Sequence, residues 1–260
     1  MIYKEYLPNK LLTDFVNKYW WFDNTTKKKL DYTILPDGSY DLIISFDKYQ
    51  QNEISLTGIW TKQVDVSIKP NQQLFGIRFK LLAIDYILQQ SISTLCDSEE
   101  LKENDFWQLD KISFSQLKIT TEKLDKIMLS ILGSQKGIDM RKQLLFNLLY
   151  ETKGQQTIEQ YLQQLFWTSR QINRYFKKRF GISLKSYCKI LKLSASYMHL
   201  KKGQLFPEQN YFDQSHFIND LKSIQGKFHL NYLRIKTTDF YNFLRCPMIR
   251  FASHTKQQKK

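Results

Sequence analysis

Residues 168–193, TSRQINRYFKKRFGISLKSYCKILKL, indicate most clearly how the C-terminal part of this 260-residue chain folds. Ile172 and Phe176 stand four positions apart, a spacing that places both on one face of a helix. Thr168 is a good N-cap before this pair, and Gly181 follows it where a left-handed residue can end a helix. The stretch therefore predicts a helix of about three turns with defined ends.

A second helical pattern precedes this one. The apolar positions from Ile158 to Leu165 follow helical spacing, and the pattern breaks at Phe166 and Trp167 before the Thr168 cap. A helix, a short turn and a second helix form the helix-turn-helix arrangement, which places its second helix in the major groove of DNA. We therefore expect the first unit of a DNA-binding module here.

The outer face of the second helix is cationic. Arginine reads guanine edges, asparagine reads adenine, and lysine suits phosphate. The alternative, a solvated cationic helix without a partner, predicts acidic residues interleaved for i, i+4 pairing, but none occurs from Ser169 to Lys192. We expect this face and its cap to contact double-stranded DNA through Thr168, Ser169, Arg170, Gln171, Asn173, Arg174, Lys177 and Lys178.

The same design recurs 45 positions later. Phe217 and Leu221 correspond to Ile172 and Phe176, and a glycine follows each pair at the same distance. Between the two copies, residues 183–200 keep a helical apolar stripe, which makes a strut of roughly 27 Å. Successive major grooves on one side of a duplex are about 34 Å apart. One chain can therefore set two recognition helices into adjacent grooves.

The stretch from 168 to 193, followed by YFDQSHFINDLKSIQG and Tyr232, resembles the DNA-binding module of the AraC/XylS family of transcription regulators. The resemblance implies two helix-turn-helix units joined by a long helix, acting at promoters with RNA polymerase as a partner. By position it implies base contacts by Arg170, Asn173 and Arg174 in the first unit. In the second unit it implies DNA contacts by Gln214, Ser215, His216, Ile218, Asn219 and Lys222.

The chain departs from the family pattern, most of all in the second unit. Leu162 and Phe166 stand where the first unit usually has small residues. The stretch before DQSHF is shorter than in the family, and Pro207 falls where a helix interior should run, which proline does not tolerate. Asp220, directly after Asn219, repels phosphate. We expect the first unit to supply most of the affinity for DNA.

The net charge of +14 is confined to the C-terminal part. Residues 1–154 hold 20 basic and 20 acidic side chains, whereas residues 155–260 hold 19 basic and 5 acidic ones. A neutral part joined to a strongly basic part indicates two modules, the second of which faces a polyanion.

The N-terminal part reads as short strands at 19–22, 32–35, 40–46, 55–60, 64–68 and 74–79. Helical patterns follow, with one apolar stripe around Leu124 and another around Leu148; packing on the domain's own sheet is favoured over a dimerising helix pair. We expect an α+β chain, with a linker at 154–156. Its parts are a small β-barrel or sandwich-like regulatory domain over 1–150 (β-rich 1–85, helical 86–150), an all-α DNA-binding domain over 155–240 and a basic tail over 241–260.

The pieces YWWF, ILPDGSYDLIISF and FGIRF resemble an N-terminal domain of unassigned role that often precedes AraC-type modules. The resemblance implies a regulatory domain that binds a small-molecule effector or forms a homodimer. Candidate pocket residues are Trp21, Asp41, Trp60 and Arg78, together with Trp20 and Asp37. We favour the interpretation that they are core aromatics and turn or surface charges.

Several classes of protein are disfavoured. The sequence holds no G-x-S-x-G, P-loop, H-E-x-x-H or dinucleotide motif, so we expect no enzyme, catalytic residue or cofactor. Three scattered cysteines form no zinc or disulfide pattern, and no apolar run spans a membrane, so we expect a cytoplasmic protein without a metal site. The remaining alternative is a regulator that has lost specific DNA binding and acts through protein contacts.

Overall fold

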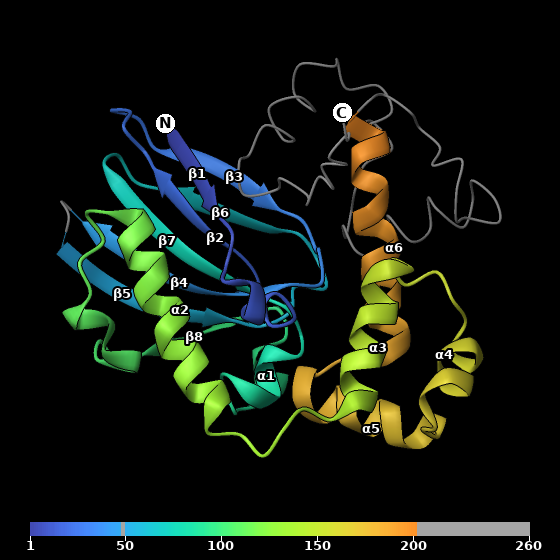
Figure 1. The fold of residues 1–260 in the computed structure, drawn as a ribbon. Coiled ribbons are helices and arrows are strands. Elements are labelled where there is room, and N and C mark those ends of the chain that lie inside the picture. The colour runs from blue at the N-terminus through green and yellow to red at the C-terminus, as the bar shows by residue number, and fades with distance from the viewer. Residues whose placement is uncertain (48–49, 202–260) are drawn as a thin grey trace, which may run out of the picture.

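Two antiparallel sheets form the N-terminal part of the protein. The structure, a computed structural model, describes residues 1–47 and 50–201. The larger sheet has the strand order β1-β2-β7-β4-β5-β8, and β3 pairs with β6 in a separate ribbon (Figure 1). The strands are β1 (Ile2–Tyr6), β2 (Val16–Asp23), β3 (Leu30–Ile34), β4 (Tyr40–Asp47), β5 (Gln50–Thr57), β6 (Val64–Ile68), β7 (Gln72–Phe79) and β8 (Glu99–Lys102).

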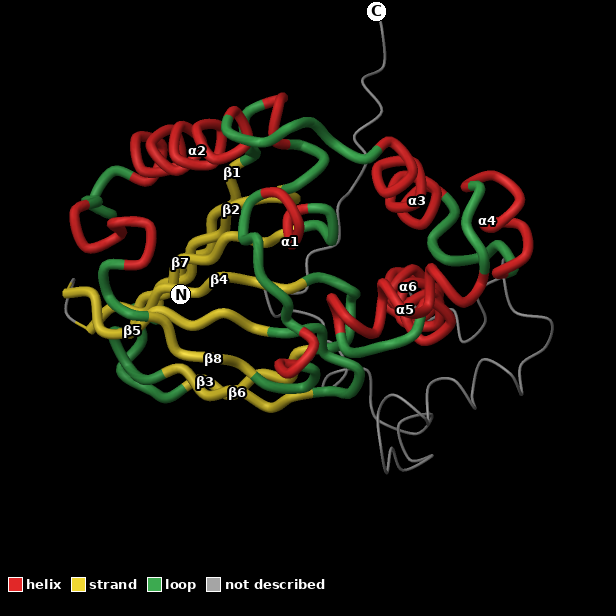
Figure 2. The backbone as a smooth tube through the Cα atoms, turned by 90° about the horizontal axis from the view of Figure 1, so that it is seen from below, coloured by secondary structure: helices red, strands yellow, loops and turns green. Residues whose placement is uncertain are grey.

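The two faces of the larger sheet have different partners because side chains alternate along a strand. Tyr19 and Phe75 point to one face, which the long helix α2 covers, and the Tyr19 hydroxyl donates to Asp125 of α2 at 2.6 Å (Figure 2). Trp20 and Phe22 point to the other face and pack with Ile68 of the β3–β6 ribbon. The result is a small sandwich whose second sheet is only a ribbon.

The six expected strands are all present; the strand expected at 64–68 has those bounds, and the other five differ at one or both ends. The strand expected at 55–60 runs from Gln50 to Thr57, so Trp60 lies in the loop that follows. Two strands were not expected, β1 and β8, and both lie at edges of the larger sheet. Their residues alternate weakly and are mostly exposed, so the hydrophobic pattern does not mark them.

Helices dominate the rest of the described chain. They are α1 (Ala83–Tyr86), α2 (Leu117–Gly133), α3 (Met140–Glu151), α4 (Ile158–Leu165), α5 (Ser169–Phe180) and α6 (Leu184–Lys201), with short 3-10 turns η1 (Lys10–Leu12), η2 (Ser93–Leu95) and η3 (Phe106–Lys111). None of them is long and apolar enough to cross a membrane. As expected, α2 packs its buried Leu124 and Met128 on the sheet. By contrast, α3 packs against α4 and α6.

The segment expected as a linker, 154–156, is a tight turn. The Gly154 amide donates to the Leu149 carbonyl, and the Gln155 amide donates to that of Thr152, so α3 passes into α4 without an extended stretch. The buried core is continuous across this turn, from Leu12 to Tyr197. The helices α3 to α6 therefore stand beside the sandwich as a cluster that shares its core (Figure 1).

Candidate nucleic-acid interface

Both helices of the expected first unit are present and capped at their N-termini. Thr157 forms a capping box with Gln160 at the start of α4, and Thr168 forms another with Gln171 at the start of α5. The turn between them contains Phe166, which has a left-handed backbone (φ 51°) and is 91% exposed. The helix-turn-helix geometry therefore arises from local signals at each helix end.

The inner face of α5 is apolar and mostly aromatic. Ile172, Phe176 and Phe180 are buried, as their spacing predicts. The ring of Phe146 in α3 lies 6.2 Å from that of Phe176, and the ring of Tyr187 in α6 lies 5.7 Å from it on the other side. This packing holds α5 between two helices and leaves its opposite face to solvent.

The exposed face of α5 carries the cations that the sequence places there. Within the part of the chain that the structure describes, Arg170, Arg174, Lys177 and Lys178 are exposed and form no ion pair. The four cations share one face of α5 and remain available to an anionic partner, whereas Ser169 is exposed at the N-terminal end of the helix.

Three other expected contact residues already have partners within the chain. Thr168 and Gln171 bond each other in the capping box. Asn173 donates to the Ser169 carbonyl at 3.0 Å, and its Oδ1 accepts from the Leu184 amide at 3.4 Å. Asn173 therefore joins α5 to the start of α6.

The last turn of α5 is tied to the sheet-bearing part through Asp85. This carboxylate, with its side chain 3% exposed, pairs with Arg179 at 2.7 Å and with Lys142 of α3 at 2.7 Å. The Tyr175 hydroxyl donates to it as well, also at 2.7 Å. Burial, followed by the Asp85 charge, raises the pKa of Tyr175 well above its ordinary value. Arg179 is thus a structural cation, unlike its neighbours Lys177 and Lys178.

Residues 91–92 complete the C-terminal end of α5. The last carbonyls of a helix have no partner within it. Here the Ser91 hydroxyl donates to the Lys178 carbonyl at 2.7 Å, and the Ile92 amide donates to that of Arg179 at 2.9 Å. Gly181 ends the helix with φ 78°, and a Cβ there would lie 2.4 Å from the Ser93 carbonyl oxygen. The position of α5 is consequently set by a loop about ninety residues earlier in the chain.

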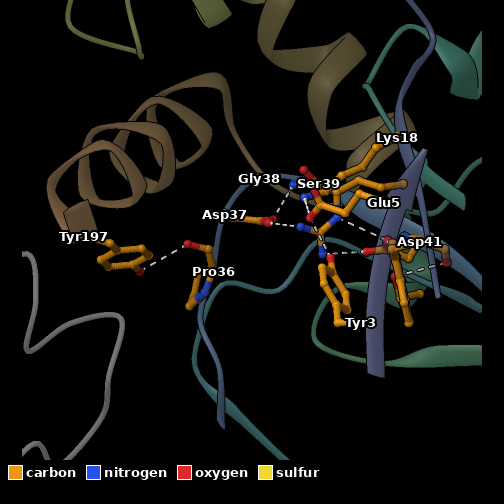
Figure 3. A network of polar contacts seen from close by, with 12 residues as sticks. Tyr3, Glu5, Lys18, Pro36, Asp37, Gly38, Ser39, Asp41 and Tyr197 are labelled. Carbon is orange, nitrogen blue, oxygen red and sulfur yellow. Dashed lines mark hydrogen bonds and ion pairs between the residues drawn. The ribbon is translucent and has the colours of Figure 1, made fainter. Parts of the chain in front are cut away.

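The turn at 36–39 forms a second link between the sandwich and the helices (Figure 3). The Tyr187 hydroxyl of α6 donates to the Gly38 carbonyl at 3.0 Å, and the Tyr197 hydroxyl donates to that of Pro36 at 3.1 Å. Burial raises the pKa of Tyr187 well above its ordinary value, so it remains a donor over the whole physiological range. Asp37, between the two carbonyls, faces the sheet.

Asp37 is held by a charge network on the ribbon-facing side of the larger sheet. Arg78 donates to Asp37 at 2.9 Å and through Nε and Nη2 to both oxygens of Asp41 at 3.2 Å. The Trp20 indole donates to Asp41 at 2.8 Å. Burial opposes the Arg78 charge, but the two aspartates outweigh it and raise the pKa of Arg78. Beside it Lys18 pairs with Glu5 at 2.6 Å.

The four expected pocket residues are not gathered in one place. Asp41 and Arg78 are cross-strand partners in the buried network. Trp21 points to the opposite face of the sheet, where its ring lies 5.8 Å from that of Phe46. Trp60 is half-buried in the loop after β5. Of the two residues named with them, Trp20 donates to Asp41 and Asp37 accepts from Arg78.

Some expected sites lie outside the described residues, and some observed ones were not expected. Outside the described residues lie the tail over 241–260 and the second-unit residues Gln214, Ser215, His216, Ile218, Asn219 and Lys222. The contacts of Asp85, Ser91 and Tyr197 were not expected, since no motif marks these residues and their partners are distant in sequence. In the described ranges no cluster of three or more His, Cys, Asp or Glu side chains is arranged to hold a metal ion.

Parts of the chain are similar to known proteins. A family described as a domain of unknown function (DUF6597) matches residues 4–100, within the sheet-bearing part. A structure of ToxT from Vibrio cholerae is similar over 82% of this chain and 95% of that chain, at 13% identity and a TM-score of 0.41. A second ToxT structure from this organism covers 83% and 97%, at 14% identity and a TM-score of 0.40. A third, of ToxT with bound unsaturated fatty acid, covers 84% and 95%, at 13% identity and a TM-score of 0.37. No curated protein matches the chain.

Proposed function

We propose that this protein is a sequence-specific DNA-binding transcription regulator of the AraC type, and that α5 is its principal recognition helix. One observation carries the proposal: four cations, free of ion pairs in the described part, share the exposed face of a capped helix whose other face is buried. A helix of this kind fits the major groove, where arginine reads bases and lysine neutralises phosphates.

The engaged side chains refine the proposed contact set. Arg170 and Arg174 are the base-reading candidates, with Ser169, Lys177 and Lys178 placed for the backbone. Thr168, Gln171 and Asn173 hold the helix ends in place, because their side chains already form hydrogen bonds within the chain. The second unit is proposed to position the protein on an adjacent groove and to add little affinity.

A salt titration on duplex DNA tests the proposal. If the protein neutralises about six phosphates, the log–log plot of the binding constant against salt concentration has a slope near −5. Replacing Lys177 and Lys178, which are placed for the phosphate backbone, by Ala should weaken binding and make the slope shallower by about one for each phosphate that is no longer neutralised. The matched control, Lys123→Ala with Lys126→Ala on the exposed side of α2, removes the same charge and should leave the slope unchanged.

Two results contradict the proposal. A binding constant that does not vary with salt excludes a phosphate interface and favours a regulator that acts through protein contacts. Equal losses of affinity in the α5 and α2 double variants show that net charge alone, and not the α5 face, governs binding.

The sandwich is proposed as the regulatory half, responsive to a small-molecule effector. This role is supported by the buried charge network of the sandwich, in which Arg78 pairs with Asp37 of the turn that contacts α6. A buried ion pair is weak evidence for stability, since apolar packing of similar volume often stabilises as much. A network kept at such a junction is therefore a candidate for control of the helices.

A further inference from the structure

The turn at 36–39 touches both the charge network of the sheet and the helix that follows α5. Asp37 faces Arg78, whereas the carbonyls of Pro36 and Gly38, on either side of Asp37, face α6. Gly38 has φ 80°, and a Cβ there would lie 3.0 Å from the Tyr187 ring and 3.1 Å from Leu191. The turn is thus in close contact with α6 and has no room to shift towards it.

On the sheet side, the Arg78–Asp37 ion pair binds the turn. Arg78 holds Asp41 with two of its nitrogens, but Asp41 belongs to β4 and is fixed by the sheet. Asp37 occupies the remaining nitrogen, Nη1, and belongs to the turn. The Asp37 side chain is 28% exposed, against 12% for Arg78. Asp37 is therefore the partner that can leave Arg78 without disturbing the sheet.

On the helix side, the turn is bound by two buried tyrosines almost three turns apart. Tyr187 and Tyr197 are both on the buried side of α6, and each donates its hydroxyl proton to a turn carbonyl. Two bonds ten residues apart fix the direction of the helix as well as its distance. If the turn moves, each of the two hydroxyls loses a hydrogen bond in a buried setting, which costs free energy.

From α6 the path continues to α5 by direct contact. The Tyr187 ring packs against Phe176, and the Leu184 amide at the start of α6 donates to Asn173. Both partners lie in α5. A shift of α6 at Tyr187 must therefore repack the inner face of α5 or break its link to α6.

We infer that the turn at 36–39 is a conformational coupler: it transmits the state of the Arg78–Asp37 pair to α6 and, through Tyr187, to α5. The coupling between the Arg78 charge network and α6 follows from the observed contacts and does not depend on the proposed function. Only its last consequence, an effect on nucleic-acid binding, rests on the proposed function.

Hydrogen exchange read by mass spectrometry tests the coupling in the full-length protein. Asp37→Asn removes the charge that pairs with Arg78 but keeps the oxygen that accepts from the Ser39 amide. We expect exchange in residues 184–197 to rise about three- to tenfold, as loss of one or two hydrogen bonds implies, with no change in the β1–β2 edge. The matched control is Glu5→Gln, which breaks the Lys18–Glu5 pair on the same face and leaves the Arg78–Asp37 pair intact. If Asp37→Asn and Glu5→Gln give the same exchange in α6, the inference is overturned.

The reverse experiment does not depend on the stability of the Asp37 variant. Coupling between two sites is reciprocal, so a change at α6 must be felt at the network. Tyr197→Phe removes one donor from α6 and should raise exchange in residues 36–41 as well as in α6. A rise confined to α6 contradicts the coupling.

Binding to a fixed duplex, measured on the same variants, separates this inference from the proposed function. If wild-type protein binds no duplex, the proposed function fails, while the exchange data still decide the coupling. If wild-type protein binds and α6 exchange does not respond to Asp37→Asn, the proposed function stands and the coupling fails. Where both hold, Asp37→Asn should change the dissociation constant by a similar three- to tenfold factor, and Glu5→Gln should not.

Discussion

The hydroxyl of Tyr175 donates a 2.7 Å hydrogen bond to the carboxylate of Asp85, 90 positions away in the sequence. Arg179 and Lys142 pair with the same carboxylate, which is almost fully buried. One acidic side chain from α1 therefore holds α3 and α5 together.

Asp85→Ala should lower the free energy of unfolding by about 1–3 kcal/mol. The change leaves two cations and a hydroxyl without their shared acceptor. The cost stays moderate because Lys142 and Arg179 are 20% and 31% exposed, so water replaces part of the interaction. Urea unfolding measures the change, with Asp110→Ala, an exposed aspartate, as control. Equal effects of the two changes rule out a structural role for Asp85.

Gly181→Ala should destabilise the protein by more than about 2 kcal/mol. Its positive φ disfavours any Cβ, and the Ser93 carbonyl, 2.4 Å from the Cβ position, leaves no space for one. Gly133→Ala is the matched control, since it stands at the end of α2 with nothing within 4 Å of its Cβ position. There alanine should stabilise by up to about 1 kcal/mol. Thermal or urea unfolding should show opposite signs for the two glycines, and the same sign would contradict this prediction.

Phe166→Gly should leave stability unchanged or raise it by up to about 1 kcal/mol. The side chain is almost fully exposed, so little packing is lost, and glycine relieves the left-handed backbone of the turn. Phe166→Ala keeps the strain and should gain nothing. A loss of more than about 1 kcal/mol in the glycine variant would mean that the exposed ring packs on another part of the chain.

Cys188 should be unreactive in the folded protein. Burial raises the pKa of its thiol to about 12, so at pH 8 the reactive thiolate is about a ten-thousandth of the population. The raised pKa also means that the folded state binds this proton more tightly. Its contribution to stability is therefore complete below the ordinary pKa of 9.0 and is lost as the pH rises towards 12. In a Cys96→Ser, Cys246→Ser variant at pH 8, a thiol reagent should react at least about a hundredfold more slowly than in denaturant. Equal rates would show that the thiol is accessible in the native protein.

Arg174→Ala should weaken binding to a specific duplex by about 1–3 kcal/mol, and Gln214→Ala should weaken it less. Arg174 stands on the exposed face of α5, whereas Gln214 belongs to the unit whose surroundings hold three acidic residues from Glu208 to Asp220 and no lysine or arginine. Binding titrations at one salt concentration compare the two. The opposite ranking would make the second unit the main reader.

The local elements could be read from the amino-acid pattern. Thr168 and Gly181 mark the ends of α5 because capping depends on neighbours within four residues. The six expected strands follow from the alternation of apolar side chains, whereas β1 and β8, at the edges of the larger sheet and with few buried residues, carry no such pattern. The exposed cations of α5 follow from the helical period and the position of Phe176.

What no local pattern contains is the way these elements meet. The Asp85 cluster, the capping of α5 by Ser91 and the contact of Tyr197 with Pro36 join groups tens of residues or more apart in sequence. Such contacts form only when the whole core closes, since each element buries its apolar face against a distant one. The residues of α5 thus suffice to specify a cationic helix with two caps, but its placement against the sandwich, and the coupling that placement permits, arise from tertiary packing.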